Sequence, residues 1–155
     1  WFGVGYLLVW GGFSAAATAL QWGLETARLL SPMLSTTHRW LGAGILMAAG
    51  LWQWTPVKTV CLRHCRSPIG FLAGNWRPGR AGALRMGLAH GAYCLGCCWV
   101  LMLLLFFGGV MNLYWIAALA IYVLLEKTLM LGQVFGRLAG LVLLMTGLGL
   151  AIRAM

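Results

Sequence analysis

The side chains best suited to chemistry gather in residues 90–99, whose sequence is HGAYCLGCCW. Each residue of an α-helix turns by about 100°, so one imidazole and three thiols of this stretch would share roughly a third of a helix circumference. These four side chains belong to His90, Cys94, Cys97 and Cys98. Imidazole and thiolate are ligands of Cu(I) and Zn²⁺. The stretch therefore predicts a soft-metal site on one face of a helix.

A second pair of thiols, Cys61 and Cys65, lies upstream in a basic segment. Their spacing places both sulfurs on one face if the segment is helical. We expect the neighbouring cations to lower the thiol pKa and so to favour the metal-binding thiolate. The pair is predicted to be the place where the metal enters or is handed over, and inert reduced thiols are the alternative.

Glu126 is the one acid inside an apolar segment. Ionisable side chains within membrane segments are functional by default. Three roles are open to Glu126: a metal ligand, a partner for the ring N–H of His90, or an acceptor of the protons that thiols release when they bind metal. A structural ion pair with Lys127 is the alternative.

The predicted ligand set is rich in sulfur, and methionines lie nearby, which favours copper as Cu(I). Zinc is the alternative metal. The sequence contains no serine triad, carboxylate pair or phosphate-binding loop, so hydrolase and nucleotide chemistry are disfavoured. No catalytic residue is assigned, and the sequence leans against an enzyme.

The elements that must position these residues are membrane helices. Only 8% of the 155 residues are charged, against roughly 25% in soluble proteins. Since a spanning helix needs about 20 apolar residues, we expect an all-α, multipass transmembrane bundle that forms a single domain over residues 1–155. About five spanning helices are predicted, at residues 1–24, 39–55, 84–107, 111–131 and 134–152. The chain begins with Trp1 rather than Met, so an earlier segment is expected to precede it.

The net charge of +9 has a membrane explanation. In a soluble protein it would suggest nucleic acid, but here it suits anionic lipid headgroups, so the bilayer is the predicted partner. Loops on the side of residues 56–83 carry eight of the 11 basic residues. The positive-inside rule therefore predicts that the loop 56–83 lies in the cytoplasm. The five cysteines, two histidines and Glu126 would then converge at that face.

Four motifs of this chain occur together in a known family of membrane proteins. The motifs are Pro56-x-Lys58-x2-Cys61-Leu-x2-Cys65-Arg66-x-Pro68, then His90-Gly91-x-Tyr93-Cys94-x-Gly96-Cys97-Cys98-Trp99-x-Leu101-Met102, then Met111-Asn112-x2-Trp115, and finally Glu126-Lys127. Together they resemble the prokaryotic predicted metal-binding integral membrane proteins, known as domain of unknown function 2182. The resemblance covers about residues 35–155. It implies a multi-helix bundle of the prokaryotic cytoplasmic (inner) membrane with a thiol and histidine site, and it supplies no reaction.

Three functions fit these observations. The favoured one is copper handling, delivery or transport, with a metallochaperone or copper enzyme as partner. The second is a membrane thiol–disulfide oxidoreductase that uses Cys94 and Cys97, with Cys61 and Cys65 as the shuttle pair. Thiols on the cytoplasmic side and within a regular helix disfavour that reading. The third is an accessory subunit of a larger membrane complex or homo-oligomer.

Overall fold

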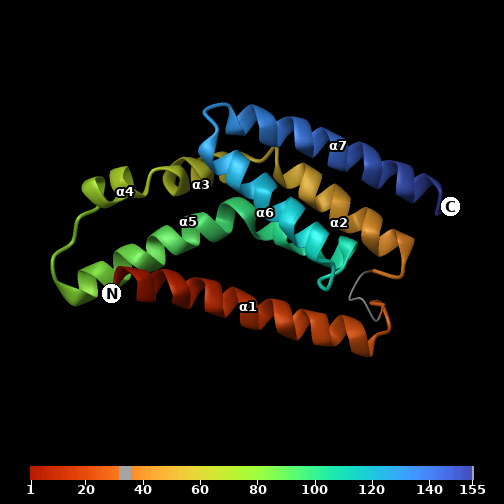
Figure 1. Ribbon diagram of the computed structural model, residues 1–155, viewed down its shortest axis with the longest axis horizontal. Helices are drawn as coiled ribbons and strands as arrows, with labels where there is room; N and C mark the ends of the chain where they lie inside the picture. The colour runs from red at the N-terminus through yellow and green to blue at the C-terminus, as the bar shows by residue number, and fades with distance from the viewer. Residues whose placement is uncertain (32–35, 155) are drawn as a thin grey trace. The chain divides into compact units, whose positions relative to one another are not determined.

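The computed structural model describes residues 1–31 and 36–154 and is built from α-helices (Figure 1). Within these ranges it contains seven helices, which confirms the all-α prediction. They are α1 (Phe2–Thr26), α2 (Arg39–Trp52), α3 (Pro56–Arg66), α4 (Pro68–Gly74), α5 (Gly79–Gly108), α6 (Leu113–Thr128) and α7 (Gly132–Ile152).

The prediction of five spanning helices is wrong. Among the described residues three helices are long and apolar enough to cross a membrane, namely α1, α5 and α7. Helices α2 and α6 have 14 and 16 residues. At 1.5 Å per residue they reach about 21 and 24 Å, short of a hydrocarbon core of about 30 Å. Hydropathy alone did not reveal where these helices begin and end. For example, Asn112 caps the start of α6 by accepting a hydrogen bond from the backbone N–H of Trp115.

The chain divides into two compact units. The first comprises Trp1–Leu20 and Pro56–Cys98, and the second comprises Gln21–Thr55 and Trp99–Met155. The division falls within α1 and within α5. Each unit is built around helices that approach closely at glycine.

In the first unit, the first part of α1 lies alongside the first part of α5 (Figure 1). A Cβ atom at Gly87 would collide with the backbone carbonyl of Phe2, so the two helices touch there through their main chains. Further along, a Cβ at Gly91 would lie 3.1 Å from the side chain of Val9. Residue numbers therefore rise together along both helices, so the two helices run in the same direction.

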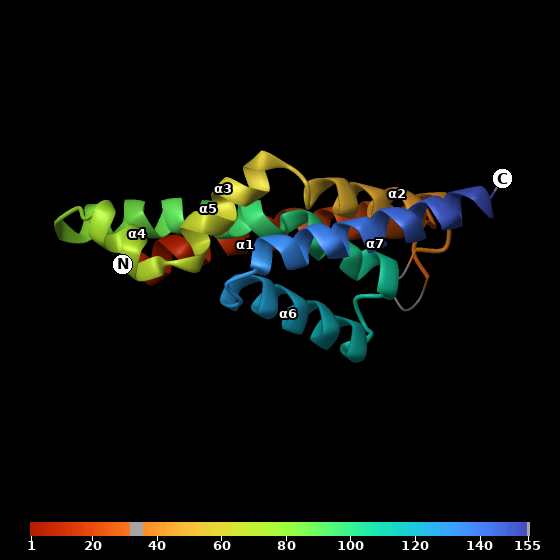
Figure 2. The same cartoon turned by 90° about the horizontal axis from the view of Figure 1, so that it is seen from above.

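In the second unit, α2 and α7 form an antiparallel pair (Figure 2). A Cβ at Gly50 would lie 2.8 Å from the carbonyl oxygen of Gly140, and one at Gly147 would lie 3.2 Å from the carbonyl oxygen of Ala43. The absence of side chains at these glycines lets the two backbones meet. Glycine at these positions therefore sets the close approach of α2 and α7.

Candidate metal centre

Helix α3 places the first thiols. Pro56 starts it, and Arg63, His64 and Arg66 lie in its last turn, where cations favour a helix end. Its buried face carries Lys58, Leu62 and Cys65, which are spaced four and three residues apart. The segment is helical, so the predicted condition for Cys61 and Cys65 to share a face is met.

Helix α5 places three more thiols in one turn. Cys94, Cys97 and Cys98 are buried, with exposed fractions of 4%, 1% and 1%. The thiol of Cys97 makes hydrogen-bond contacts with those of Cys65, Cys94 and Cys98. Four buried sulfurs from two helices therefore form one group, which we call the thiol cluster. Cys65 belongs to this cluster, although the sequence alone had assigned it to a separate pair with Cys61.

The thiols of the cluster are arranged as hydrogen-bond donors. The Sγ atoms of Cys97 and Cys98 both donate to the backbone carbonyl of Cys94, at 3.0 and 3.1 Å. In the described ranges no three His, Cys, Asp or Glu side chains are arranged to hold a metal ion. Thiols that donate hydrogen bonds to a carbonyl still carry their protons, so they are not yet placed as metal ligands. Metal ligands are thiolates, so Cys97 and Cys98 would have to lose both protons and both hydrogen bonds before they could hold an ion.

Cys61 lies apart from the cluster and is half-exposed. A Cβ placed on Gly96 of α5 would lie 2.8 Å from its sulfur, so the thiol rests against the backbone of α5. Burial raises the pKa of the Cys61 thiol above its ordinary value of 9.0. The expectation that the basic segment lowers this pKa is therefore wrong, because loss of water around the thiolate outweighs the nearby cations.

His90 sits among aromatic rings. It is 7% exposed, and its ring centroid lies 5.3 Å from that of Phe71, 5.7 Å from that of Phe2 and 6.1 Å from that of Tyr6. The hydroxyl of Tyr6 is 3.4 Å from the sulfur of Cys94. Tyr6 therefore links the histidine to the thiol cluster. The sequence analysis missed Tyr6 and Phe71, because only the packing of α1 and α4 against α5 brings them here.

Glu126 belongs to the second unit, where it is 1% exposed on α6. The hydroxyl of Tyr122 makes a hydrogen-bond contact with Glu126 and accepts a bond of 2.7 Å from Nε2 of Gln53. Gly136 of α7 faces the Glu126 carboxylate, since a Cβ there would collide with it. Glu126 is thus part of a buried polar group within its own unit. Gln53 and Tyr122 carry no sequence signal for this role.

A cavity of about 240 Å³ lies beside Phe71 in the first unit. Arg77, Arg85 and Asn75 line it together with Met86. Two guanidinium groups disfavour a bare Cu⁺ ion, so this cavity is a poor approach for the metal. The half-exposed Cys61 is the better candidate.

The family model of the PpoB2 copper chaperones matches residues 1–150, which is nearly the whole chain. The chain belongs to this copper chaperone family. Membership of the PpoB2 family agrees with the prediction of copper handling. The match does not name domain of unknown function 2182, so that narrower resemblance stays a prediction. No curated protein and no solved structure matches the chain.

Proposed function

We propose that this chain is a membrane copper chaperone that holds Cu(I) in the thiol cluster and passes it to a copper enzyme. The proposal rests on the thiol of Cys97, which contacts three other cysteine thiols. Four adjacent sulfurs are a ligand set that suits a soft ion such as Cu(I). The burial of all four side chains supports protection of the bound ion from water and oxidants.

Binding exchanges protons for metal. When two thiols bind one Cu⁺ ion, two S–H bonds break, two Cu–S bonds form, and two protons leave. The complex then carries one net negative charge, and copper keeps its oxidation state. Transfer is a ligand exchange in which a thiolate of the receiving protein replaces one cysteine sulfur at a time. No oxidant or reductant is required.

Cys61 is proposed as the handover thiol. It lies one helical turn before Cys65 on α3 and is more exposed than any thiol of the cluster. A copper ion moving between the cluster and a partner would therefore meet Cys61 on the accessible side. Its raised pKa keeps it protonated until a metal ion displaces the proton.

His90 and Glu126 keep smaller proposed roles. His90 contacts Tyr6, whose hydroxyl reaches the sulfur of Cys94, so we propose that it holds this hydroxyl in place. Ligation of copper by His90 stays a prediction. For Glu126 the proposed role is to accept protons that the thiols release when they bind copper. Glu126→Gln should therefore change the number of protons released to the buffer during copper loading.

The proposed location is the prokaryotic inner membrane, with the basic segment in the cytoplasm. Helices α1 and α5 run in the same direction, so if both cross the membrane, Phe2 and Gly79 lie on one side of it. The arginines and lysine of residues 56–83 adjoin the start of α5 and favour the cytoplasmic face.

The test is copper loading of the full chain in detergent under reducing conditions. Wild type is expected to bind about one Cu(I) per chain, measured by elemental analysis after competition with a chromogenic Cu(I) chelator. The double variant Cys97→Ser, Cys98→Ser should lose it. The control Cys61→Ser removes one thiol outside the cluster and should keep the stoichiometry but slow the transfer. Equal copper in wild type and double variant contradicts the proposal.

The position of Cys94 and Cys97 disfavours the oxidoreductase alternative. Both lie within one continuous helix, where the separation and the dihedral angle that a disulfide needs are hard to reach. An accessory role in a larger complex is compatible with the same contacts but predicts no copper stoichiometry, so the loading experiment separates it from the chaperone.

A further inference from the structure

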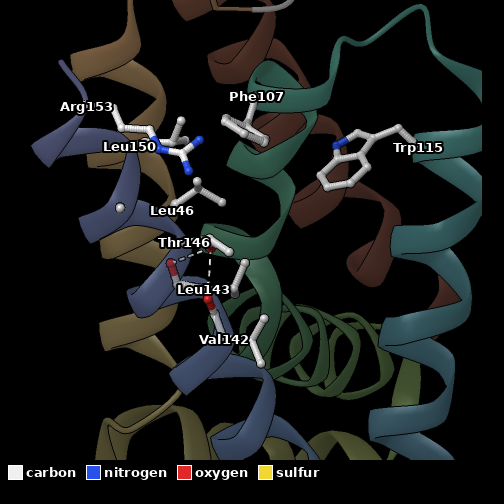
Figure 3. Close-up of a pocket in the computed structure, with 9 residues that line it drawn as sticks. Leu46, Phe107, Trp115, Val142, Leu143, Thr146, Leu150 and Arg153 are labelled. Atoms are coloured by element: carbon white, nitrogen blue, oxygen red, sulfur yellow. Dashed lines mark hydrogen bonds between the residues drawn. The ribbon is translucent and has the colours of Figure 1, made fainter.

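The second unit contains a cavity of about 560 Å³ with mostly apolar walls. Four helices contribute to it: Leu46 comes from α2, Phe107 from α5, Trp115 from α6, and Leu150 from α7 (Figure 3). Its volume falls within the roughly 300–1,000 Å³ usual for ligand pockets. A second cavity of about 350 Å³ shares Trp115 with it. The two cavities also share Val142 and Leu143, so they lie next to each other.

Two polar groups on the apolar part of the wall, the hydroxyl of Thr146 and the indole N–H of Trp115, are already hydrogen-bonded. The hydroxyl of Thr146 donates to the carbonyl oxygens of Val142 and Leu143 on its own helix, at 2.8 and 3.0 Å. The indole N–H of Trp115 donates to the carbonyl oxygen of Leu104 at 2.7 Å. These groups need no hydrogen bond from a ligand. A hydrocarbon chain therefore suits the interior better than a polar molecule.

One end of the cavity is cationic. Arg153 stands at the C-terminal end of α7 and turns its guanidinium toward the space (Figure 3). Arg39 of α2 donates a hydrogen bond of 3.3 Å to the backbone carbonyl of Arg153, so a second guanidinium lies at the same end. The chain has 11 basic and two acidic residues, so most of its cations must find their counter-charge elsewhere.

We propose that this cavity binds an anionic phospholipid, with an acyl chain against Trp115 and Leu150 and the phosphate against Arg153. Helix α7 is long and apolar enough to span the bilayer. Its interior residues then lie at the depth of acyl chains, and Arg153 at its end lies at the depth of headgroups. A guanidinium binds phosphate through paired hydrogen bonds. The site is independent of the thiol cluster, which belongs to the other unit.

Lipid retention by the full chain in detergent tests this proposal. Native mass spectrometry would compare added phosphatidylglycerol with added phosphatidylcholine of the same acyl chains. Wild type should retain one phosphatidylglycerol in preference to phosphatidylcholine. Arg153→Gln should weaken the binding of phosphatidylglycerol about fivefold and leave the binding of phosphatidylcholine unchanged, since one basic side chain near a membrane surface contributes about 1 kcal/mol.

A matched pair of glycine variants tests the acyl chain. Gly149 lines the cavity, and a Cβ there meets nothing within 4 Å, so Gly149→Leu fills the space without a backbone collision. It should reduce retention of both lipids. Gly44 of α2 has the same open surroundings but does not line the cavity, so Gly44→Leu is the control and should retain lipid. Gly149→Ala, a smaller change, serves if the leucine variant fails to fold.

Three results would overturn the proposal. If wild type and Arg153→Gln each retained phosphatidylglycerol and phosphatidylcholine equally well, Arg153 would not contact the headgroup. If the folded Gly149→Leu or Gly149→Ala variant retained both lipids like wild type, the acyl chain would not lie in this cavity. Displacement of phosphatidylglycerol by inorganic phosphate alone would mean that only an anion is recognised.

Discussion

At the scale of the residue, Cys97 organises the candidate metal site. Its thiol contacts cysteines of its own helix and one from α3, and its side chain is 1% exposed. Two of the cluster thiols donate hydrogen bonds to the backbone carbonyl of Cys94. If the cluster holds Cu(I) as proposed, the ion would replace the protons and the hydrogen bonds of these thiols and would offset part of the thiolate charge.

Tyr6 is expected to strengthen copper binding through Cys94. Tyr6→Phe removes a hydroxyl that lies 3.4 Å from the Cys94 sulfur. Loss of one hydrogen bond to the thiolate costs about 1 kcal/mol, so Cu(I) affinity should fall about fivefold in a competition titration. Tyr114→Phe is the control, because Tyr114 is 91% exposed. If both variants bind Cu(I) like wild type, Tyr6 has no part in the site.

The raised pKa of Cys61 predicts slow alkylation at neutral pH. Because the folded protein favours the neutral thiol, the rate of reaction with iodoacetamide should rise with a midpoint above 9.0. Peptide mass mapping over a pH series would measure it at this residue. The same residue in SDS-unfolded protein should show a midpoint near the ordinary value of about 8.5 to 9. A folded midpoint at or below the unfolded one would contradict the structure.

At the scale of the element, the approach of α1 to α5 brings Tyr6 to the thiol cluster. Their contact depends on glycine, since a side chain at Gly87 would meet the backbone of Phe2. The backbone carbonyl cannot turn aside as a flexible side chain can. The geometry around Cys94 thus rests on a residue that has no chemistry of its own.

Gly87→Ala should therefore destabilise the first unit. Overpacking of this kind costs about 1–3 kcal/mol, and it should lower both the apparent Tm in detergent and the Cu(I) affinity. Gly3→Ala, also on α1, is the control, because a Cβ at Gly3 meets nothing within 4 Å. Both substitutions raise helix propensity alike, so a difference reports the contact with Phe2. Equal Tm values for the two variants would show that α1 and α5 do not pack closely here.

At the scale of the whole molecule, charge and helix direction combine into a topology. The starts of α1 and α5 lie together, and the basic segment 56–83 leads into α5. The proposed topology combines this arrangement with the positive-inside rule and puts residues 56–83 in the cytoplasm. The proposed handover thiol, Cys61, would then face the cytoplasm.

Cysteine labelling in cells tests this topology. In a Cys61→Ser background, a membrane-impermeant maleimide added from outside should leave the exposed position Asn75→Cys unlabelled, because the proposed topology puts residues 56–83 in the cytoplasm. Lysis should make Asn75→Cys reactive, which controls for its accessibility. Labelling of Asn75→Cys in intact cells would contradict the proposed topology.

Sequence reasoning succeeded where the determinants are local. The helix over residues 90–98 and the shared face of its thiols follow from a turn of about 100° per residue. Apolar runs located the long helices, but caps such as Asn112 shortened others below a spanning length. The inclusion of Cys65 in the cluster and the contact of Tyr6 with Cys94 depend on which helices touch. No pattern along one chain segment encodes such long-range contacts.

The division of the cluster between two helices gives it a movable part. Three sulfurs keep a fixed spacing along the 30 residues of α5, whereas Cys65 sits on the 11-residue α3, which begins at Pro56 and is followed by Pro68. A displacement of α3 would therefore shift one sulfur of the cluster without any change in α5. If the cluster holds Cu(I) as proposed, release of the ion would require movement of this short helix rather than separation of the longer ones.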